Sequence, residues 1–152
     1  LLAFEQGNRW NKAISEGGDA AVQGALDLIT TFSQGKMNPE MLGYYSPGAK
    51  IFKNVWEQVV DDAEEFNDPG RFTAFIAFEW TSLIKGNNMH RNVIFRDGPV
   101  RTRQVVPYTM TPPQGSPNPR DLWKYLADYE QNTGGEVLAI AHNGNLSNGI
   151  MF

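Results

Sequence analysis

The sequence predicts an α/β fold, and two observations carry this prediction. In three separate segments apolar residues recur every three or four positions, which is typical of helices with one buried side. Between and after these helices lie short runs, 72–78 and 137–141, that are apolar on both alternating faces. Such runs are typical of strands covered on both sides, so we expect a parallel sheet with helices packed against it.

The first part of the chain is predicted to contain one helix. Residues 1–18 are polar and weakly patterned, so we expect a loop or a frayed helix there. A helical stripe follows, with Asp19 as the expected N-cap and Gly35 as the stop. The stripe consists of Ala21, Val22, Ala25, Leu26, Ile29 and Phe32.

A second helix is expected to begin at Ser46 and Pro47, with the serine as its cap and the proline in its first turn. It carries the most persistent apolar stripe of the sequence. The stripe consists of Ile51, Phe52, Val55, Trp56, Val59, Val60 and Ala63. Acidic residues beside the stripe are expected to face solvent and not to bind a metal.

The second half of the chain is predicted to alternate strands with one further helix. That helix begins at Asn118 and Pro119 and ends at Gly134 and Gly135. Strands are expected at residues 72–78, 92–95, 105–106 and 137–141. The Pro-rich and Gly-rich loop 107–119 is too long for a simple connector and is therefore a candidate for function.

Composition excludes several classes of protein. The chain has 13 Lys and Arg against 17 Asp and Glu, a net charge of −4, which argues against an electrostatic nucleic-acid binder. With no cysteine, it has no disulfides, thiolate metal sites or cysteine nucleophiles. Apolar runs are far shorter than the ~20 residues that span a bilayer. We expect a soluble protein without a membrane span, either cytoplasmic or periplasmic, whose oligomeric state the sequence leaves unknown.

The two ends of the chain suggest an internal piece of a longer protein. It does not begin with Met, and it stops at Phe152 without a helix cap or a polar tail. We therefore expect residues 1–152 to form one partial domain, truncated at both ends. Residues 1–47 would be its loosely patterned helical and loop part, and residues 48–152 its α/β core with the candidate site.

Two predicted strands end in a polar residue. Glu79 follows the run 72–78, and His142 follows 137–141, while His90 precedes the strand 92–95. Catalytic groups collect at the carboxyl ends of parallel strands, so these side chains can face one pocket. A carboxylate and two imidazoles suit zinc, manganese or iron. The structural alternative is that backbone carbonyls satisfy both histidines and that Glu79 pairs with Arg91 or Arg96.

Polar neighbours of these residues are candidates for binding a substrate. The amides of Asn88, Asn143 and Asn145 can orient a substrate, although Asn is also an ordinary turn former. Arg91 can bind a phosphate or carboxylate bidentately. Adjacent side chains of an extended segment point to opposite faces, so Arg91 and His90 need not share a pocket.

Three segments resemble a known family. They are FIAFEWT (75–81), GNNMHRNVIFRDG (86–98) and LAIAHNGNLSNG (138–149), supported by PYTMTPPQGS (107–116) and NPRDLW (118–123). They are similar to the bacterial family known as domain of unknown function 3604, related to the polymerase and histidinol phosphatase (PHP) superfamily. The resemblance implies part of a distorted, TIM-like β/α barrel with two or three divalent metal ions.

In that resemblance Glu79, His90 and His142 fall on three metal-ligand positions, with Glu79 bridging two ions. The superfamily's leading His-x-His, its Asp-His and its late Asp-x-His have no counterpart in these 152 residues. They would lie outside the chain if it is a fragment, and the fragment alone is then expected to be inactive.

Two functions are compatible with the sequence. The first is a PHP-like hydrolase in which metal-activated water attacks a phosphoester or related bond of a small-molecule substrate. Glu79 and His142 would then be catalytic, and Asn88, Arg91, Asn143 and Asn145 would bind the substrate. The second is a non-catalytic PHP-like binding or scaffold domain for a carbohydrate or protein partner.

Overall fold

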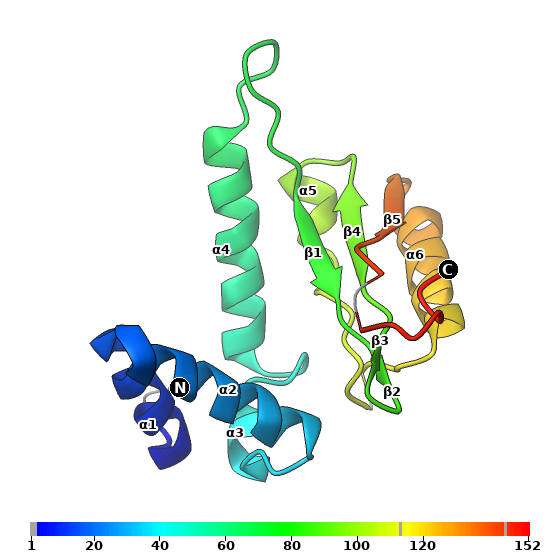
Figure 1. The fold of residues 1–152 in the computed structure, drawn as a ribbon. Coiled ribbons are helices and arrows are strands. Elements are labelled where there is room, and N and C mark those ends of the chain that lie inside the picture. The colour runs from blue at the N-terminus through cyan, green and yellow to red at the C-terminus, as the bar shows by residue number, and fades with distance from the viewer. Residues whose placement is uncertain (1–2, 113, 145) are drawn as a thin grey trace. The chain divides into compact units, whose positions relative to one another are not determined.

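A computed structural model describes residues 3–112, 114–144 and 146–152, which fold as a mixture of helices and strands (Figure 1). The chain divides into two compact units, Leu1–Ser46 and Pro47–Phe152. The elements are α1 (Glu5–Glu16), α2 (Gly18–Ser33), α3 (Pro39–Tyr44), α4 (Lys50–Phe66), β1 (Ala77–Trp80), β2 (Leu83–Ile84), β3 (Asn87–Asn88), β4 (Arg91–Phe95), α5 (Pro99–Thr102), α6 (Pro119–Thr133) and β5 (Val137–Ala141). Of the described helices, none has the length and apolar character needed to cross a bilayer.

The first unit is a helical hairpin followed by a short helix. Gly17, with φ 81°, separates α1 from α2, and the two helices pack closely where Gly24 lies. A Cβ there would come within 2.8 Å of the Ala13 Cβ. The buried Trp10 donates its indole N–H to Asp27 across the hairpin, at 2.7 Å. The expectation of a loop or frayed helix is therefore wrong for Glu5–Glu16, which form the helix α1 packed on α2.

The helix α2 is present as predicted, but its start and its environment differ from the prediction. Its N-cap is Gly17, and Asp19 lies in the first turn instead. Most of the predicted stripe is exposed in the structure: Val22 55%, Leu26 51%, Ile29 61% and Phe32 39%. The face of α2 that packs on α1 is the one that carries Gly24 and Asp27.

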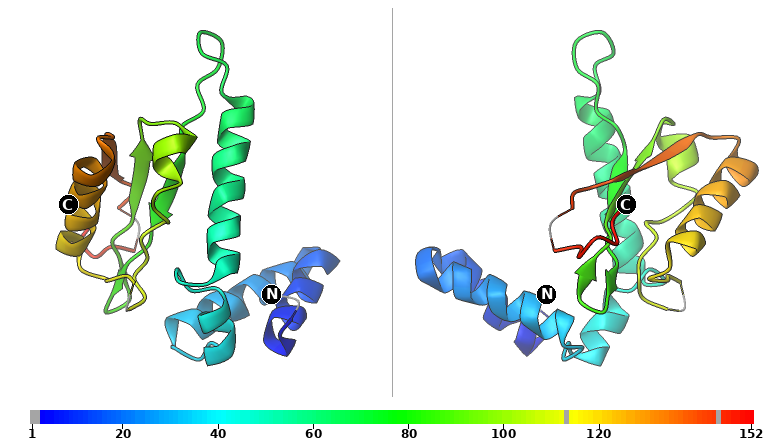
Figure 2. Two further views of the ribbon diagram at one scale, coloured as in Figure 1. Left: turned by 180° about the vertical axis from the view of Figure 1, so that it is seen from behind. Right: turned by 45° about the vertical axis from the view of Figure 1, so that its right-hand side comes forward.

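The second unit has one hydrophobic core between its sheet and its helices. Helices α4 and α6 lie beside the sheet (Figure 2), and both contribute buried side chains to this core. Its buried members are Trp56, Val60, Ile76, Trp80, Met89, Val93, Phe95, Leu122 and Tyr129. The opposite face of the sheet is open in part, since Leu138 and Ile140 of β5 are 57% and 46% exposed.

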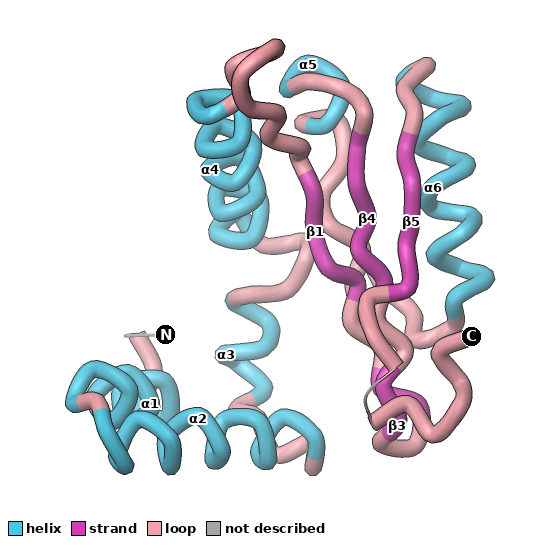
Figure 3. The backbone as a smooth tube through the Cα atoms, turned by 45° about the horizontal axis from the view of Figure 1, so that its top comes forward, coloured by secondary structure: helices cyan, strands magenta, loops and turns pink. Residues whose placement is uncertain are grey.

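The sheet is antiparallel, and the prediction of a parallel sheet is wrong. Its strand order is β1-β4-β5, with β4 antiparallel to both neighbours (Figure 3). The two outer strands run in the same direction, so the carboxyl ends of β1 and β5 meet beside the amino end of β4. Apolar runs on both faces suit parallel and antiparallel strands alike. The connection from β1 to β4 contains only the short two-stranded ribbon β2–β3, whereas a parallel pair would need a longer crossover.

Several strands and helices begin or end at residues other than those predicted. The strand expected at 72–78 is observed only at Ala77–Trp80, and residues 105–106 form no strand. Helix α4 has Ala49 as its N-cap, without a side-chain hydrogen bond. The expected cap, Ser46, donates instead to the Gly43 carbonyl. By contrast, Asn118 caps α6 as predicted.

The described residues form an open three-stranded sheet and a two-stranded ribbon, and no closed barrel is present among them. The predicted α/β character is therefore confirmed in its coarse form. The PHP-like barrel stays a prediction.

Candidate functional site

The register of the sheet brings the three predicted ligands to one end of it. Glu79 pairs with Asn92, one position from the carboxyl end of β1. At the same end Arg91 pairs with Ala141, so the residues just outside this pair, His90 and His142, are neighbours. The His142 backbone N–H donates to the His90 carbonyl at 3.2 Å, which extends the ladder by one step.

The three side chains also share a face. Side chains alternate along a strand, and Val93 and Phe95 of β4 point into the core. Glu79 and Asn92, which are paired in register, lie on the other face. Continued alternation puts both imidazoles on this open face, where their ring centroids lie 6.3 Å apart.

Glu79 and His90 form a direct pair. The Glu79 Oε1 lies 2.6 Å from the His90 Nδ1, with the two side chains 40% and 19% exposed. The other ring nitrogen, Nε2 of His90, is buried and has no hydrogen-bond partner among the described residues. A histidine that serves only the fold normally has both nitrogens satisfied. This unpartnered nitrogen therefore sets His90 apart from an ordinary core histidine.

The structure does not show the alternative in which Glu79 pairs with Arg91 or Arg96. Arg96 pairs with Glu136 at 2.6 Å, at the far end of β4. The Arg91 guanidinium contacts Met151 and the His90 carbonyl. Glu79 therefore pairs with His90, and neither arginine neutralises it in these contacts.

His142 is more exposed than His90 and is held by its neighbour. Its Nδ1 lies within hydrogen-bond distance of the Asn143 side-chain amide. An amide that fixes one ring nitrogen sets the tautomer and leaves Nε2 for another partner. Asn143 thus contacts a proposed ligand directly, whereas its predicted role toward a substrate stays a prediction.

The other residues predicted to bind a substrate are Asn88, Asn145 and Arg91. The backbone N–H of Asn88, in β3, donates to the Leu146 carbonyl at 3.0 Å, which ties the segment after β5 to the ribbon. Asn145 lies outside the described residues. The Arg91 contacts with Met151 had no signal in the sequence, because they depend on the chain returning to the sheet after β5.

The donor set fits a divalent cation only in part. One carboxylate and two imidazoles are donors that zinc, manganese and iron accept. In residues 3–112, 114–144 and 146–152, however, no three His, Cys, Asp or Glu side chains stand close enough together to hold a metal ion as they are. Glu79 and His90 are in contact, and His142 would have to approach them.

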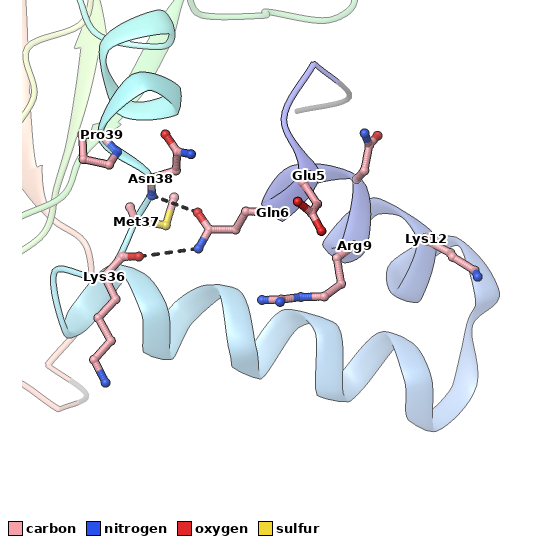
Figure 4. A pocket seen from close by; sticks show the side chains of 9 residues that line it. Glu5, Gln6, Arg9, Lys12, Lys36, Met37, Asn38 and Pro39 are labelled. Carbon is pink, nitrogen blue, oxygen red and sulfur yellow. Dashed lines mark hydrogen bonds between the residues drawn. The ribbon is translucent and has the colours of Figure 1, made fainter.

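Two cavities are lined by residues other than those of this site. One, of about 820 Å³, belongs to the first unit (Figure 4). There the Gln6 side chain bridges the Asn38 N–H and the Lys36 carbonyl. The other, of about 430 Å³, is in the second unit and is lined by Lys53, Arg103, Gln104, Val105, Val106, Pro107, Tyr108, Gln114 and Tyr125. The second cavity includes part of the loop 107–119 that the sequence marked as a candidate for function.

Comparison with known proteins adds a family and nothing finer. The profile of a family described as "Protein of unknown function (DUF3604)" matches residues 1–152. No curated protein and no solved structure matches the chain.

Proposed function

We propose that this chain, which belongs to the DUF3604 family, carries part of the metal site of a PHP-like hydrolase that acts on phosphoester or related bonds. The observation that supports the proposal most is the contact of 2.6 Å between Glu79 and His90, with His142 hydrogen-bonded beside them. The three residues lie at or beside the ends of three different strands, which the register of the sheet brings to one end of it.

Glu79, His90 and His142 would hold the metal. When bound, such an ion supplies a Lewis acid and lowers the pKa of water toward neutrality. Oε1 of Glu79 and Nδ1 of His90 lie 2.6 Å apart, so a carboxylate and an imidazole stand together, and both are donors that zinc, manganese and iron accept. The resemblance to PHP proteins implies two or three ions, whose further ligands must come from outside the described residues.

The chain's own residues would bind and orient a small-molecule substrate around this centre. Glu79 is 40% exposed, so its carboxylate can also accept a proton from solvent or substrate. Asn88, Asn143 and Asn145 remain the proposed amide contacts to the substrate. The sequence also predicts that Arg91 binds the substrate, but in the structure its guanidinium contacts Met151.

The proposal is tested on the full-length protein with two variants, Glu79→Gln and His142→Ala. Each is expected to lose bound metal, measured by plasma emission, and hydrolysis of p-nitrophenyl phosphate, by at least tenfold. The matched control is Glu136→Gln, which removes an exposed carboxylate that pairs with Arg96 at the other end of the sheet. Unchanged metal content in both site variants would overturn the metal assignment.

A second candidate is a binding domain for a carbohydrate or protein partner. It is favoured by the cavity of about 430 Å³ beside the loop 107–119, where Tyr108 stacks on Tyr125 with centroids 5.1 Å apart. Titration calorimetry separates the two functions. Heat from micromolar Mn²⁺ or Zn²⁺ added to the full-length protein supports the hydrolase, and no heat supports the binding domain.

A further inference from the structure

Arg91 makes a set of contacts that differs from those of the exposed arginines. Its Nη1 donates to the His90 carbonyl at 3.0 Å and contacts the Met151 sulfur at 2.9 Å. Its Nη2 donates to the Met151 carbonyl at 2.8 Å. These partners are all uncharged. Arg9, Arg71, Arg96, Arg101 and Arg103 each pair with a carboxylate instead.

Uncharged partners make this arrangement costly. Desolvation disfavours a cation that no carboxylate compensates, and burial lowers the pKa of the Arg91 guanidinium. Met151 is fully buried, so the contact is enclosed. A lysine could not make the same contacts, because they use two nitrogens of one planar fork.

The contacts of Arg91 converge on the backbone that carries the candidate ligands. The His90 carbonyl accepts both the Arg91 guanidinium and the His142 N–H. Strand alternation puts the Arg91 side chain on the face of Val93, opposite the imidazoles. The guanidinium therefore joins the His90 carbonyl to the Met151 carbonyl on the core face of the sheet, opposite the face that carries the imidazoles.

We infer that Arg91 is a positioning residue, which fixes the spacing of the His90 and His142 imidazoles by clamping the His90 carbonyl to Met151. The effect of Arg91 on metal affinity rests on the proposed function. The effect of Arg91 on the two imidazoles is independent of that function, because the clamp consists of contacts within the chain.

The first test needs no metal. Because the chain has only 2 histidines, long-range ¹H–¹⁵N spectra resolve each imidazole nitrogen. Arg91→Lys is expected to shift the nitrogens of both rings, while the indole signals of Trp56 stay in place. Arg96→Gln is the matched control, since Arg96 is 73% exposed and lies at the other end of β4. Unchanged imidazole signals in a folded Arg91→Lys variant would overturn the inference.

A measurement on the unmodified chain keeps the test decisive if the variant does not fold. The Nη hydrogens of Arg91 and the His142 amide are expected to exchange with solvent slowly and with similar rates. Met151→Leu, which keeps the carbonyl contact and removes the sulfur, is expected to preserve both the slow exchange and the imidazole signals. Rapid exchange of the Arg91 hydrogens in the unmodified chain would contradict the clamp.

The second test links the clamp to the proposed metal. Arg91→Lys is expected to weaken Co²⁺ binding by about 10- to 100-fold and to alter the visible absorption of bound Co²⁺, as loss of an outer contact to a ligand does. Arg96→Gln should bind Co²⁺ like the unmodified protein. If the unmodified protein binds no Co²⁺, the proposed function fails, and the imidazole spectra still decide the role of Arg91. Equal affinity and equal spectra in Arg91→Lys would overturn the inference.

Discussion

Asp97 shows how one buried carboxylate joins three segments of the second unit. Its Oδ2 accepts from the Tyr129 hydroxyl at 2.9 Å and from the Glu136 N–H at 2.6 Å. Its Oδ1 accepts from Arg101 at 2.7 Å. Burial opposes ionisation, but the hydrogen bonds from Glu136, Arg101 and Tyr129 outweigh it and lower the pKa of Asp97. This carboxylate therefore holds α6 and β5 to the turn after β4.

Asp97→Asn is expected to lower the free energy of unfolding by about 1–3 kcal/mol at pH 7, because charge-assisted hydrogen bonds are lost in a buried place. A lowered pKa in the folded state stabilises the fold above the unfolded pKa of about 3.9. This stabilisation is lost as the pH falls through the lower folded pKa, so the deficit of the variant should shrink below about pH 4. Urea unfolding at several pH values measures the difference in unfolding free energy between Asp97→Asn and the unmodified protein.

Asp128→Asn, an exposed acid on α6, is the control for that series. It should change the unfolding free energy by no more than about 0.5 kcal/mol at any pH. A deficit in Asp97→Asn that stays constant down to pH 2.5 would contradict the ionised, hydrogen-bonded state of Asp97.

The N-caps of the helices show where sequence patterns predict the start of a helix correctly and where they do not. Asn118 accepts the Arg120 N–H at 3.1 Å, and Asn38 accepts two N–H groups at the start of α3. Each precedes a proline in the first turn, and of the two the sequence predicted the cap at Asn118. Ser46 also precedes a proline, but α4 begins only at Lys50 with Ala49 as its N-cap, and the Ser46 hydroxyl donates to the Gly43 carbonyl of the preceding helix.

Asn118→Ala is expected to destabilise the second unit by about 1 kcal/mol, since it leaves an N–H at the start of α6 unpaired. Ser46→Ala should change stability by less than about 0.5 kcal/mol, because that side chain caps no helix here. Thermal unfolding followed by circular dichroism compares the two variants. Similar losses from both variants would contradict the different roles that the structure gives to Asn118 and Ser46.

The sequence predicted elements better than their arrangement. Helices α2, α4 and α6 and strand β5 follow from local periodicity, which depends only on neighbours along the chain. The direction of β4 does not, because apolar runs on both faces suit parallel and antiparallel pairs alike. Glu79, His90 and His142 lie at one end of the sheet, since the outer strands run in parallel. Among the described residues, however, no three such side chains are close enough together to hold a metal ion, so their convergence on one ion stays a prediction. The Arg91 clamp was missed because Met151 is distant in sequence.

At the scale of the whole molecule, burial is unevenly divided between the two units. The hydrophobic core cluster lies entirely within the second unit. In the first unit the large buried side chains are Trp10 and Met41, while Val22, Leu26 and Ile29 of α2 are more than half exposed. A unit of this size with so few buried side chains cannot offset the entropy of folding by itself.

Residues 47–152 expressed alone are expected to unfold cooperatively and to keep the near-ultraviolet circular dichroism of Trp56 and Trp80. Residues 1–46 alone are expected to show no cooperative transition. Thermal melts of the two pieces test this. Loss of the tertiary signal in the 47–152 piece would show that its core needs the first unit.

The central claim is that Glu79, His90 and His142 bind one divalent cation. The most direct measurement is paramagnetic broadening of the two imidazoles on addition of substoichiometric Mn²⁺ to the full-length protein. We expect the signals of both rings to broaden first, and Glu79→Gln to abolish the broadening at the same Mn²⁺ concentration. Broadening that spares both rings, or that persists in Glu79→Gln, would contradict the claim.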